Sequence, residues 1–334
     1  MRKVLPFTQP LAYGYQYYAF PLGILANHPK ATDWVLSNYL QVVYDTRTAA
    51  PVPFAFYVYD YAESPWFEII RINRGWCAAQ DKGIAGIVRD AISSDFYVYL
   101  TLNERFVPER PKYGTDIDFP HDTLIRGVDD ESATFELYGY DQKMQFRGTQ
   151  LAQADLATAY WNTGPGPFYE VPVTMYRYDD AGEYTFDRAF LAQGIVEYLD
   201  SFNTSKHYQA HRDPWDRVYG MATYDLLAAH LDEYGAGATR FDVRRLQVLW
   251  EHKRVMAARL TRCADLVPEV GDLIPPYQRV ERQAWMLRGM MMAHHAGRYT
   301  GDFRTAAVAV LDGIRTAERD ILEKFAAYLS AAYV

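Results

Sequence analysis

The chain has 334 residues, of which 49% are hydrophobic and 23% are charged, a balance typical of globular proteins with a buried core. This composition excludes a disordered or fibrous protein. The net charge of −8 argues against a nucleic-acid binder, because binding to phosphate groups needs a concentrated basic surface. The 28 tyrosines belong to an aromatic content of 16%, and tyrosine suits half-buried positions and the walls of polar pockets.

The cysteines and the N-terminal segment predict a reduced, cytoplasmic protein. Cys77 and Cys263 are the two cysteines, so the sequence holds neither a disulfide framework nor a CxxC metal site. The N-terminal segment is interrupted by Pro6 and Pro10 and lacks the apolar run of a signal peptide. No apolar stretch approaches the about 18 residues of a membrane span. We therefore expect no membrane partner.

The first part of the chain, residues 1–178, is predicted to form an α+β domain. Its apolar residues change between helical and strand periodicity, with prolines and glycines between the segments. The expected elements are, in chain order, helices in 21–29 and 31–45, strands within 52–72, a helix over 82–95, a strand over 96–102, a loop over 104–120, a β-hairpin over 121–140, a helix over 150–161 and a strand over 173–178.

The remaining residues, 179–334, are predicted to form an all-helical bundle domain. Apolar residues recur three and four positions apart, and prolines and glycines separate the runs. These runs are 186–202, 219–235, 241–266, 279–300 and 304–334. The predicted fold class is therefore α+β, with an α+β domain followed by a helical one.

The hairpin contains the most specific candidate for catalysis. A symmetric hairpin that turns at Asp130–Glu131 pairs His121 with Tyr140 or Asp141. The Asp141 carboxylate would then orient the imidazole and fix its tautomer, which leaves the other ring nitrogen to move protons. The alternative interpretation is a strand-end histidine beside an aspartate that only stabilises a turn.

Two segments of this domain resemble a known family. The strand FYVYLTLNERFVP, preceded by the helix KGIAGIVRDAI, and the segment FPHDTLIRGVDDESATFELYGYD are similar to the N-terminal domains of butirosin-type (BtrH-like) acyltransferases. Those domains are papain-like and related to peptidases that trim double-glycine leader peptides. The helical segments VYGMATYDLL and DVRRLQVLWEHKRVMAARL resemble the region that follows in these bacterial natural-product proteins.

The resemblance implies acyl transfer by a cysteine, a histidine and an aspartate, here His121 and Asp141. In the family, a thiolate takes an acyl group from a carrier-protein thioester and passes it to an amino group of an antibiotic precursor. The nucleophile is expected at the start of a helix near the N-terminus. The corresponding stretch, TQPLAYGYQYYAFPLGILAN, contains no cysteine and no serine. Its candidates for substrate binding are Tyr15, Gln16 and Tyr17, and an amide side chain such as Gln16 can also stabilise an oxyanion.

Three interpretations of the missing nucleophile stay open. Cys77, which precedes a predicted helix, is one candidate nucleophile. Alternatively, His121 and Asp141 act as general acid and base alone, in acyl transfer, cyclisation or elimination on an acyl or non-ribosomal peptidyl intermediate. In the third interpretation the site is inactive, and the fold serves as a scaffold or binds a carrier protein. Asn103 and Tyr113 are predicted to line the site.

We expect no metal and no other cofactor. His207 and His211 are four residues apart, but their polar context favours a solvated helix end over a metal site. Glu251, His252, His294 and His295 lack the Glu-x-x-His spacing of a bundle metal site. The expected partners are a small-molecule or peptidyl substrate and an acyl or peptidyl carrier protein, and a homodimer is left open. The basic residues of 244–262 are interpreted as the solvated face of a helix, with carrier docking as the alternative.

Overall fold

The computed structural model describes residues 1–47, 50–164 and 171–331, and confirms a mixed α and β chain with a helical C-terminal region. It divides into two compact units. The first unit comprises residues 1–32 and 60–184, and the second comprises residues 33–59 and 185–334. The predicted boundary at 178/179 leaves 33–59 in the first domain, whereas the structure groups this segment with the C-terminal helices.

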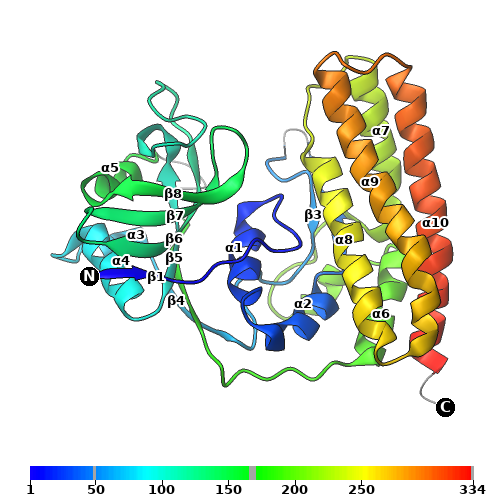
Figure 1. Cartoon of the computed structure of the whole chain (residues 1–334), viewed down its shortest axis with the longest axis horizontal. Helices are drawn as coiled ribbons and strands as arrows, with labels where there is room; N and C mark the ends of the chain where they lie inside the picture. The colour runs from blue at the N-terminus through cyan, green and yellow to red at the C-terminus, as the bar shows by residue number, and fades with distance from the viewer. Residues whose placement is uncertain (48–49, 165–170, 332–334) are drawn as a thin grey trace. The chain divides into compact units, whose positions relative to one another are not determined.

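The first unit contains a seven-stranded antiparallel sheet. Six strands follow the order β4-β9-β5-β6-β7-β8, and β1 pairs with β6. The strands are β1 (Arg2–Val4), β4 (Phe67–Ile72), β5 (Tyr97–Asn103), β6 (Pro120–Asp129), β7 (Thr134–Tyr140), β8 (Phe146–Ala152) and β9 (Val173–Tyr178). The helices are α1 (Gln16–Leu25), α3 (Arg74–Ala78), α4 (Gly83–Ser93) and α5 (Leu156–Trp161), with short 3-10 turns η1 (Pro29–Ala31), η2 (Glu104–Phe106) and η3 (Gln153–Asp155). Figure 1 shows α3 and α4 on one side of this sheet and α1 on the other.

Local sequence explains the central hairpin and the helix before it. In β7, buried Phe135 and Leu137 alternate with half-buried residues, which is the period of a strand with one face in a core. In α4, the residues spaced for one helical face, including Ile84, Val88 and Ile92, are buried. The helix predicted over 150–161 is correct only for its second half, because Gln150–Ala152 belong to β8 and pair with β7. Pairing with β7 outweighs the local helix propensity of residues 150–152.

The second unit is mainly helical but is not all-helical. Its helices are α2 (Thr32–Asn38, with Thr32 at the boundary), α6 (Arg188–Leu199), α7 (Thr223–Gly235), α8 (Arg244–Ala264), α9 (Ile274–His295) and α10 (Phe303–Ala331), with 3-10 turns η4 (Thr204–Tyr208), η5 (Gly220–Ala222) and η6 (Pro268–Leu273). A small antiparallel sheet has the order β10-β2-β3, from β2 (Val42–Tyr44), β3 (Phe54–Phe56) and β10 (Val218–Tyr219). Residues 42–44, predicted within a helix, therefore form a strand. Among the described residues, no helix has the length and apolar character needed to cross a membrane.

Candidate functional site

His121 is the second residue of β6 and contacts the first residue of α1, Gln16. Its register partner is Leu102 of β5, and its Nδ1 atom lies 2.7 Å from Nε2 of Gln16. The same Gln16 nitrogen donates to the main-chain oxygen of Asp122 at 2.6 Å, and its Oε1 atom accepts from the main-chain N–H of Tyr140 at 2.8 Å. Gln16 is 4% exposed. Its buried amide therefore links the start of α1 to strands β6 and β7.

These contacts determine the orientation of the Gln16 amide and the tautomer of His121. A flipped amide would set Oε1 against the Asp122 carbonyl and Nε2 against the Tyr140 N–H, and neither pair is a hydrogen bond. Because Nε2 of Gln16 is the donor, Nδ1 of His121 is the acceptor. In this tautomer the ring proton lies on Nε2. We assign this tautomer from the network of donors and acceptors.

Two carboxyl groups that the sequence analysis missed lie near His121. Oε1 of Glu104, in η2, is 3.6 Å from Nδ1 of the histidine. Burial raises the Glu104 pKa, while His121 and Arg110 act in the opposite direction. Asp122, the next residue of β6, also has a pKa raised by burial, which His121 and a hydrogen bond from Tyr99 partly oppose. In the sequence, the signs of these two groups are that Asp122 directly follows His121 and that Glu104 directly follows Asn103.

Asp141 lies in a turn, not beside the histidine. Its Oδ1 atom accepts from the main-chain N–H groups of Lys143 and Gln145, and its Oδ2 atom is 2.6 Å from Nε of Arg147. Burial raises its pKa, but the hydrogen bonds from Gln145 and Arg147 outweigh burial and leave it below the ordinary value. Within the described part of the chain, no hydrogen bond or ion pair joins His121 to Asp141.

The strand register explains why the expected histidine–aspartate contact is not made. The β6–β7 ladder starts from Leu124 opposite Tyr138, and a bulge follows between Ile125 and Gly127. The earlier residues of β6, His121 among them, pair with β5. The chain after Tyr140 bends into the turn before β8, which Asp141 stabilises through the N–H groups that it accepts.

Cys77 lies in α3, fully buried. Burial raises the pKa of its thiol, against a hydrogen bond from Tyr160 and the charge of Arg74. A raised pKa disfavours the thiolate that acyl transfer needs. The structure thus places Cys77 with groups of α3 and α5, whereas His121 contacts Gln16 and Glu104.

Asn103 and Tyr113, which were predicted to line the site, differ in burial. Asn103 is fully buried and its side chain is saturated: Nδ2 donates to Asp118 and to the Asn162 carbonyl, and Oδ1 accepts from two main-chain N–H groups. It therefore stabilises the loop that precedes β6 and has no group left for a ligand. Tyr113, in the same loop, is 48% exposed.

Tyr15 and Tyr17 belong to an aromatic cluster at the start of α1. Their rings stack at a centroid distance of 5.7 Å, and Tyr17 packs edge-on against Tyr61 at 4.8 Å. Tyr15 is buried and precedes the helix as its N-cap residue, whereas Tyr17 is half-buried. Burial raises the Tyr17 pKa well above its ordinary value, and Tyr61, Tyr15 and the Asp122 carboxyl group add to the shift.

The histidines named as alternative metal ligands contact other groups. His207 lies 2.8 Å from Glu197, and the rings of His294 and His295 stack on Phe303 and Phe241. In the described ranges, no three His, Cys, Asp or Glu side chains are grouped so as to hold a metal ion.

The basic residues of α8 differ in exposure: Lys253 and Arg259 are buried, Arg254 and Arg262 are half-buried, and Arg244 is exposed. Lys253 and Arg259 are at most 1% exposed. Arg259 donates to the main-chain oxygens of Leu36 and Tyr39. Arg262 pairs with Asp33. Lys253, Arg259 and Arg262 therefore make contacts within the second unit.

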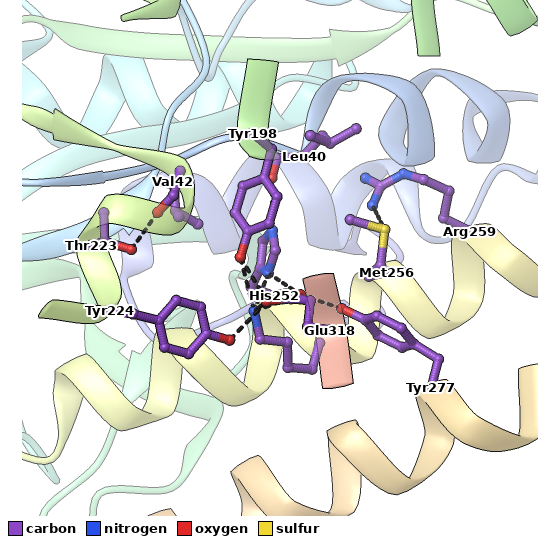
Figure 2. Close-up of polar contacts among 12 residues, drawn as sticks. Leu40, Val42, Tyr198, Thr223, Tyr224, His252, Met256, Arg259, Tyr277 and Glu318 are labelled. Carbon is purple, nitrogen blue, oxygen red and sulfur yellow. Dashed lines mark hydrogen bonds and ion pairs between the residues drawn. The ribbon is translucent and has the colours of Figure 1, made fainter. Parts of the chain in front are cut away.

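Lys253 belongs to a buried polar cluster in the second unit (Figure 2). Glu318, which is completely buried, accepts from Lys253 at 2.7 Å and from the hydroxyls of Tyr198, Tyr224 and Tyr277 at 2.8, 2.7 and 2.6 Å. His252 donates from Nε2 to the Leu40 carbonyl and accepts from Lys253 at Nδ1. The cluster thus joins residues of α6, α7, α8, α9 and α10, and these side chains are buried.

Comparison with known proteins does not assign the chain to a family. No protein-family model matches the sequence, and a search of curated proteins finds no significant match.

Proposed function

We propose that this protein binds an acyl or peptidyl intermediate of natural-product biosynthesis, presented on a carrier protein, without forming a covalent bond to it. The observation that carries the proposal is the position of Gln16. In the papain-like acyltransferases that the sequence resembles, a cysteine begins the helix that faces the histidine. Here Gln16 begins α1 and its amide is hydrogen-bonded to His121. An amide cannot carry an acyl group.

The tautomer of His121 supports binding over covalent catalysis. Its Nδ1 atom is occupied by Gln16, so it cannot take a proton from a nucleophile while that contact holds. The Nε2–H group is a hydrogen-bond donor, and the side chain is 36% exposed. A carbonyl oxygen of an acyl or peptidyl ligand is a suitable acceptor for such a donor.

A thioester probe tests this proposal directly. Wild-type protein incubated with an N-acetylcysteamine thioester should show no acyl adduct in intact-mass spectrometry. The Gln16→Cys variant should gain one adduct, because the cysteine would begin a helix beside an imidazole and its thiol pKa would fall. Adding His121→Ala to Gln16→Cys should slow adduct formation by about tenfold or more. A wild-type adduct that disappears in Cys77→Ala would instead establish a cysteine mechanism.

The second candidate function is acid–base catalysis without a covalent intermediate. Its supporting observation is that two carboxyl groups with raised pKa values, Glu104 and Asp122, lie near His121. A carboxyl group that keeps its proton closer to neutral pH can donate it to a leaving group. Turnover of the thioester in the presence of an amine, without any adduct, would favour this function if His121→Ala and Glu104→Gln both abolish it. Absence of turnover in the wild type leaves binding as the function.

A further inference from the structure

Helix α9 of the second unit exposes a stripe of large apolar side chains. Met286 is 66% exposed, Trp285 is 48% exposed and Met292 is 41% exposed. Together with the exposed Gly289 they recur three and four positions apart, so they lie on one face of the helix. The opposite face is buried, for example at Leu287. Exposed apolar side chains gathered on one face indicate an interaction surface.

The same face of α9 carries positive charge. Arg279 and Arg282 are exposed there, in the two turns that precede Trp285. Among the residues that the structure describes, neither arginine forms an ion pair or a hydrogen bond through its side chain. The one acidic residue of α9, Glu281, is half-buried. Although the chain has a net charge of −8, this face is therefore complementary to an acidic partner.

Helix α8 extends this surface along one side. It packs beside α9 (Figure 1), and the ring centres of Trp250 and Trp285 are 4.7 Å apart. The guanidinium of Arg254 lies 5.3 Å from the centre of the Trp250 ring, and that of Arg288 lies 5.0 Å from the Trp285 ring. These contacts hold the two tryptophans in place before a partner binds, which reduces the entropy cost of binding.

Gly289 leaves a notch in the middle of the stripe. Glycine is less favourable than alanine inside a helix, and a Cβ atom at this position would meet nothing within 4 Å. No contact in the described part of the chain therefore requires glycine here. A notch of this kind lets a second helix approach closely and accepts one of its side chains, because the distance between packed helices depends on the side chains at the contact.

The α9 face consists of Arg279, Arg282, Trp285, Met286, Gly289 and Met292. We propose that the α9 face, together with Trp250 of α8, binds an acidic amphipathic helix of a partner protein. Apolar residues of that helix contact the tryptophans and methionines, one of them enters the notch at Gly289, and carboxylates pair with the two arginines.

A helix suits this surface better than the other possible occupants. An extended peptide binds through main-chain groups of a sheet edge, and the surface of a helix offers none. A second copy placed symmetrically on the α9 face would bring the arginines of both copies together, and a bilayer has no side chain that fits the notch. The proposal concerns the second unit and does not rest on the proposed function.

A designed peptide tests the proposal on the full-length protein. The probe is a labelled amphipathic helix of about 20 residues, with leucines on one face and glutamates elsewhere. Fluorescence anisotropy should detect its binding, and the same peptide with lysines in place of the glutamates should bind at least about tenfold more weakly. Arg282→Glu should reverse this preference. Lys324→Glu makes the same charge change at an exposed position of α10, and it should bind like the wild type.

The notch has a test that unfolding cannot imitate. Gly289→Ala should weaken binding of the acidic peptide severalfold, although alanine favours the helix. Gly313→Ala, at an exposed position of α10, should bind like the wild type.

Several outcomes would overturn the proposal. Equal binding of the acidic and the lysine peptides would do so, as would unchanged binding in Arg282→Glu or in Gly289→Ala. A dimer of the wild type that Trp285→Ser dissociates would identify a second copy as the occupant. Co-sedimentation with phosphatidylglycerol vesicles that Trp285→Ser abolishes would identify a membrane.

Discussion

The Gln16 amide needs space beside Gly139 of β7. A Cβ atom at this position would lie 2.4 Å from Oε1 of Gln16 and 2.5 Å from Nη1 of Arg110. The backbone there has a φ of 154°, which favours glycine. The absence of a side chain therefore allows the amide and the guanidinium to reach the ends of β6 and β7.

We expect Gly139→Ala to displace Gln16 and to destabilise the protein by about 1–3 kcal/mol, because two buried polar groups must move. Urea unfolding measures the loss, and nitrogen NMR of the His121 ring should show that Nδ1 is no longer a pure acceptor. Gly148→Ala is the matched control, since its Cβ would come no closer than 3.8 Å to another group. Equal stability of the two variants would contradict this view of Gly139.

The buried cluster around Glu318 predicts how stability depends on pH. Burial and the neighbouring Lys253 lower the His252 pKa to about 3. For Glu318, burial acts to raise the pKa, but Lys253 and His252 outweigh it and lower it to about 2. The unfolded chain takes up these protons at higher pH than the folded chain, so both groups stabilise the fold above their unfolded pKa values and lose that effect in acid.

The free energy of unfolding should therefore decrease as the pH falls from about 6.5, because His252 is then protonated only in the unfolded chain. At lower pH it should decrease further, because Glu318 is also protonated only in the unfolded chain. In His252→Gln, whose amide can still donate to the Leu40 carbonyl, the slope between pH 6.5 and 4.5 should be smaller by about 1.4 kcal/mol per pH unit. Urea titrations at a series of pH values measure this slope. Identical slopes in both proteins would reject the assignment to His252.

At the scale of single elements, the long helices contain glycines that no contact requires. Gly289 in α9 and Gly313 in α10 are exposed, and a Cβ at either position would meet nothing within 4 Å. By contrast, Gly220 in η5 has a φ of 55°, and its Cβ would lie 2.1 Å from the Tyr198 main-chain oxygen. Substitution by alanine should therefore change the free energy of unfolding in opposite directions at these two kinds of position.

We expect Gly289→Ala and Gly313→Ala each to raise the free energy of unfolding by about 0.5–1 kcal/mol, since alanine limits the unfolded chain and favours the helix. Gly220→Ala should lower it by about 2 kcal/mol or more, because the clash is with main chain in a conformation that alanine rarely adopts. Thermal and urea unfolding give both values. A stable Gly220→Ala variant would show that η5 can rearrange.

Some strands and bulges cannot be predicted from the local sequence pattern. Residues 150–152 have the composition of a helix start, yet they form the end of β8 because β7 presents an open edge for pairing. The hairpin of β6 and β7 was predictable from its alternation and acidic turn. The bulge between Ile125 and Gly127 was not, since a bulge depends on the strands on both sides.

At the scale of the whole molecule, the second unit needs residues 33–59. Arg259 of α8 donates to the carbonyls of Leu36 and Tyr39, and His252 donates to Leu40. Strands β2 and β3 also come from this segment. A fragment that starts after the first unit lacks all of these partners, so it contains buried donors with no acceptor.

We therefore expect a fragment of residues 185–334 to lose cooperative unfolding, as followed by circular dichroism in urea, although its helices are long. The predicted domain 179–334 should behave in the same way, because it lacks the same segment. The intact chain is the control. A sigmoidal transition of the fragment near the midpoint of the intact chain would show that 33–59 are dispensable.

The hairpin over 121–140, most of the order of α and β segments and the mainly helical character after residue 185 can be predicted from the amino-acid sequence alone. These features depend on the period of apolar residues along a short stretch of chain, and that period is visible without a structure. The position of Gln16 at the start of α1 was not predicted, because the helix expected in this region covers residues 21–29.

The contacts of His121 and Asp141 depend on the tertiary structure. His121 meets Gln16 and Glu104, and Asp141 meets Arg147, because strand register and a bulge place groups that are distant in sequence. The membership of 33–59 in the second unit has the same origin. Contacts between distant residues depend on how the elements pack, and no local pattern encodes that packing.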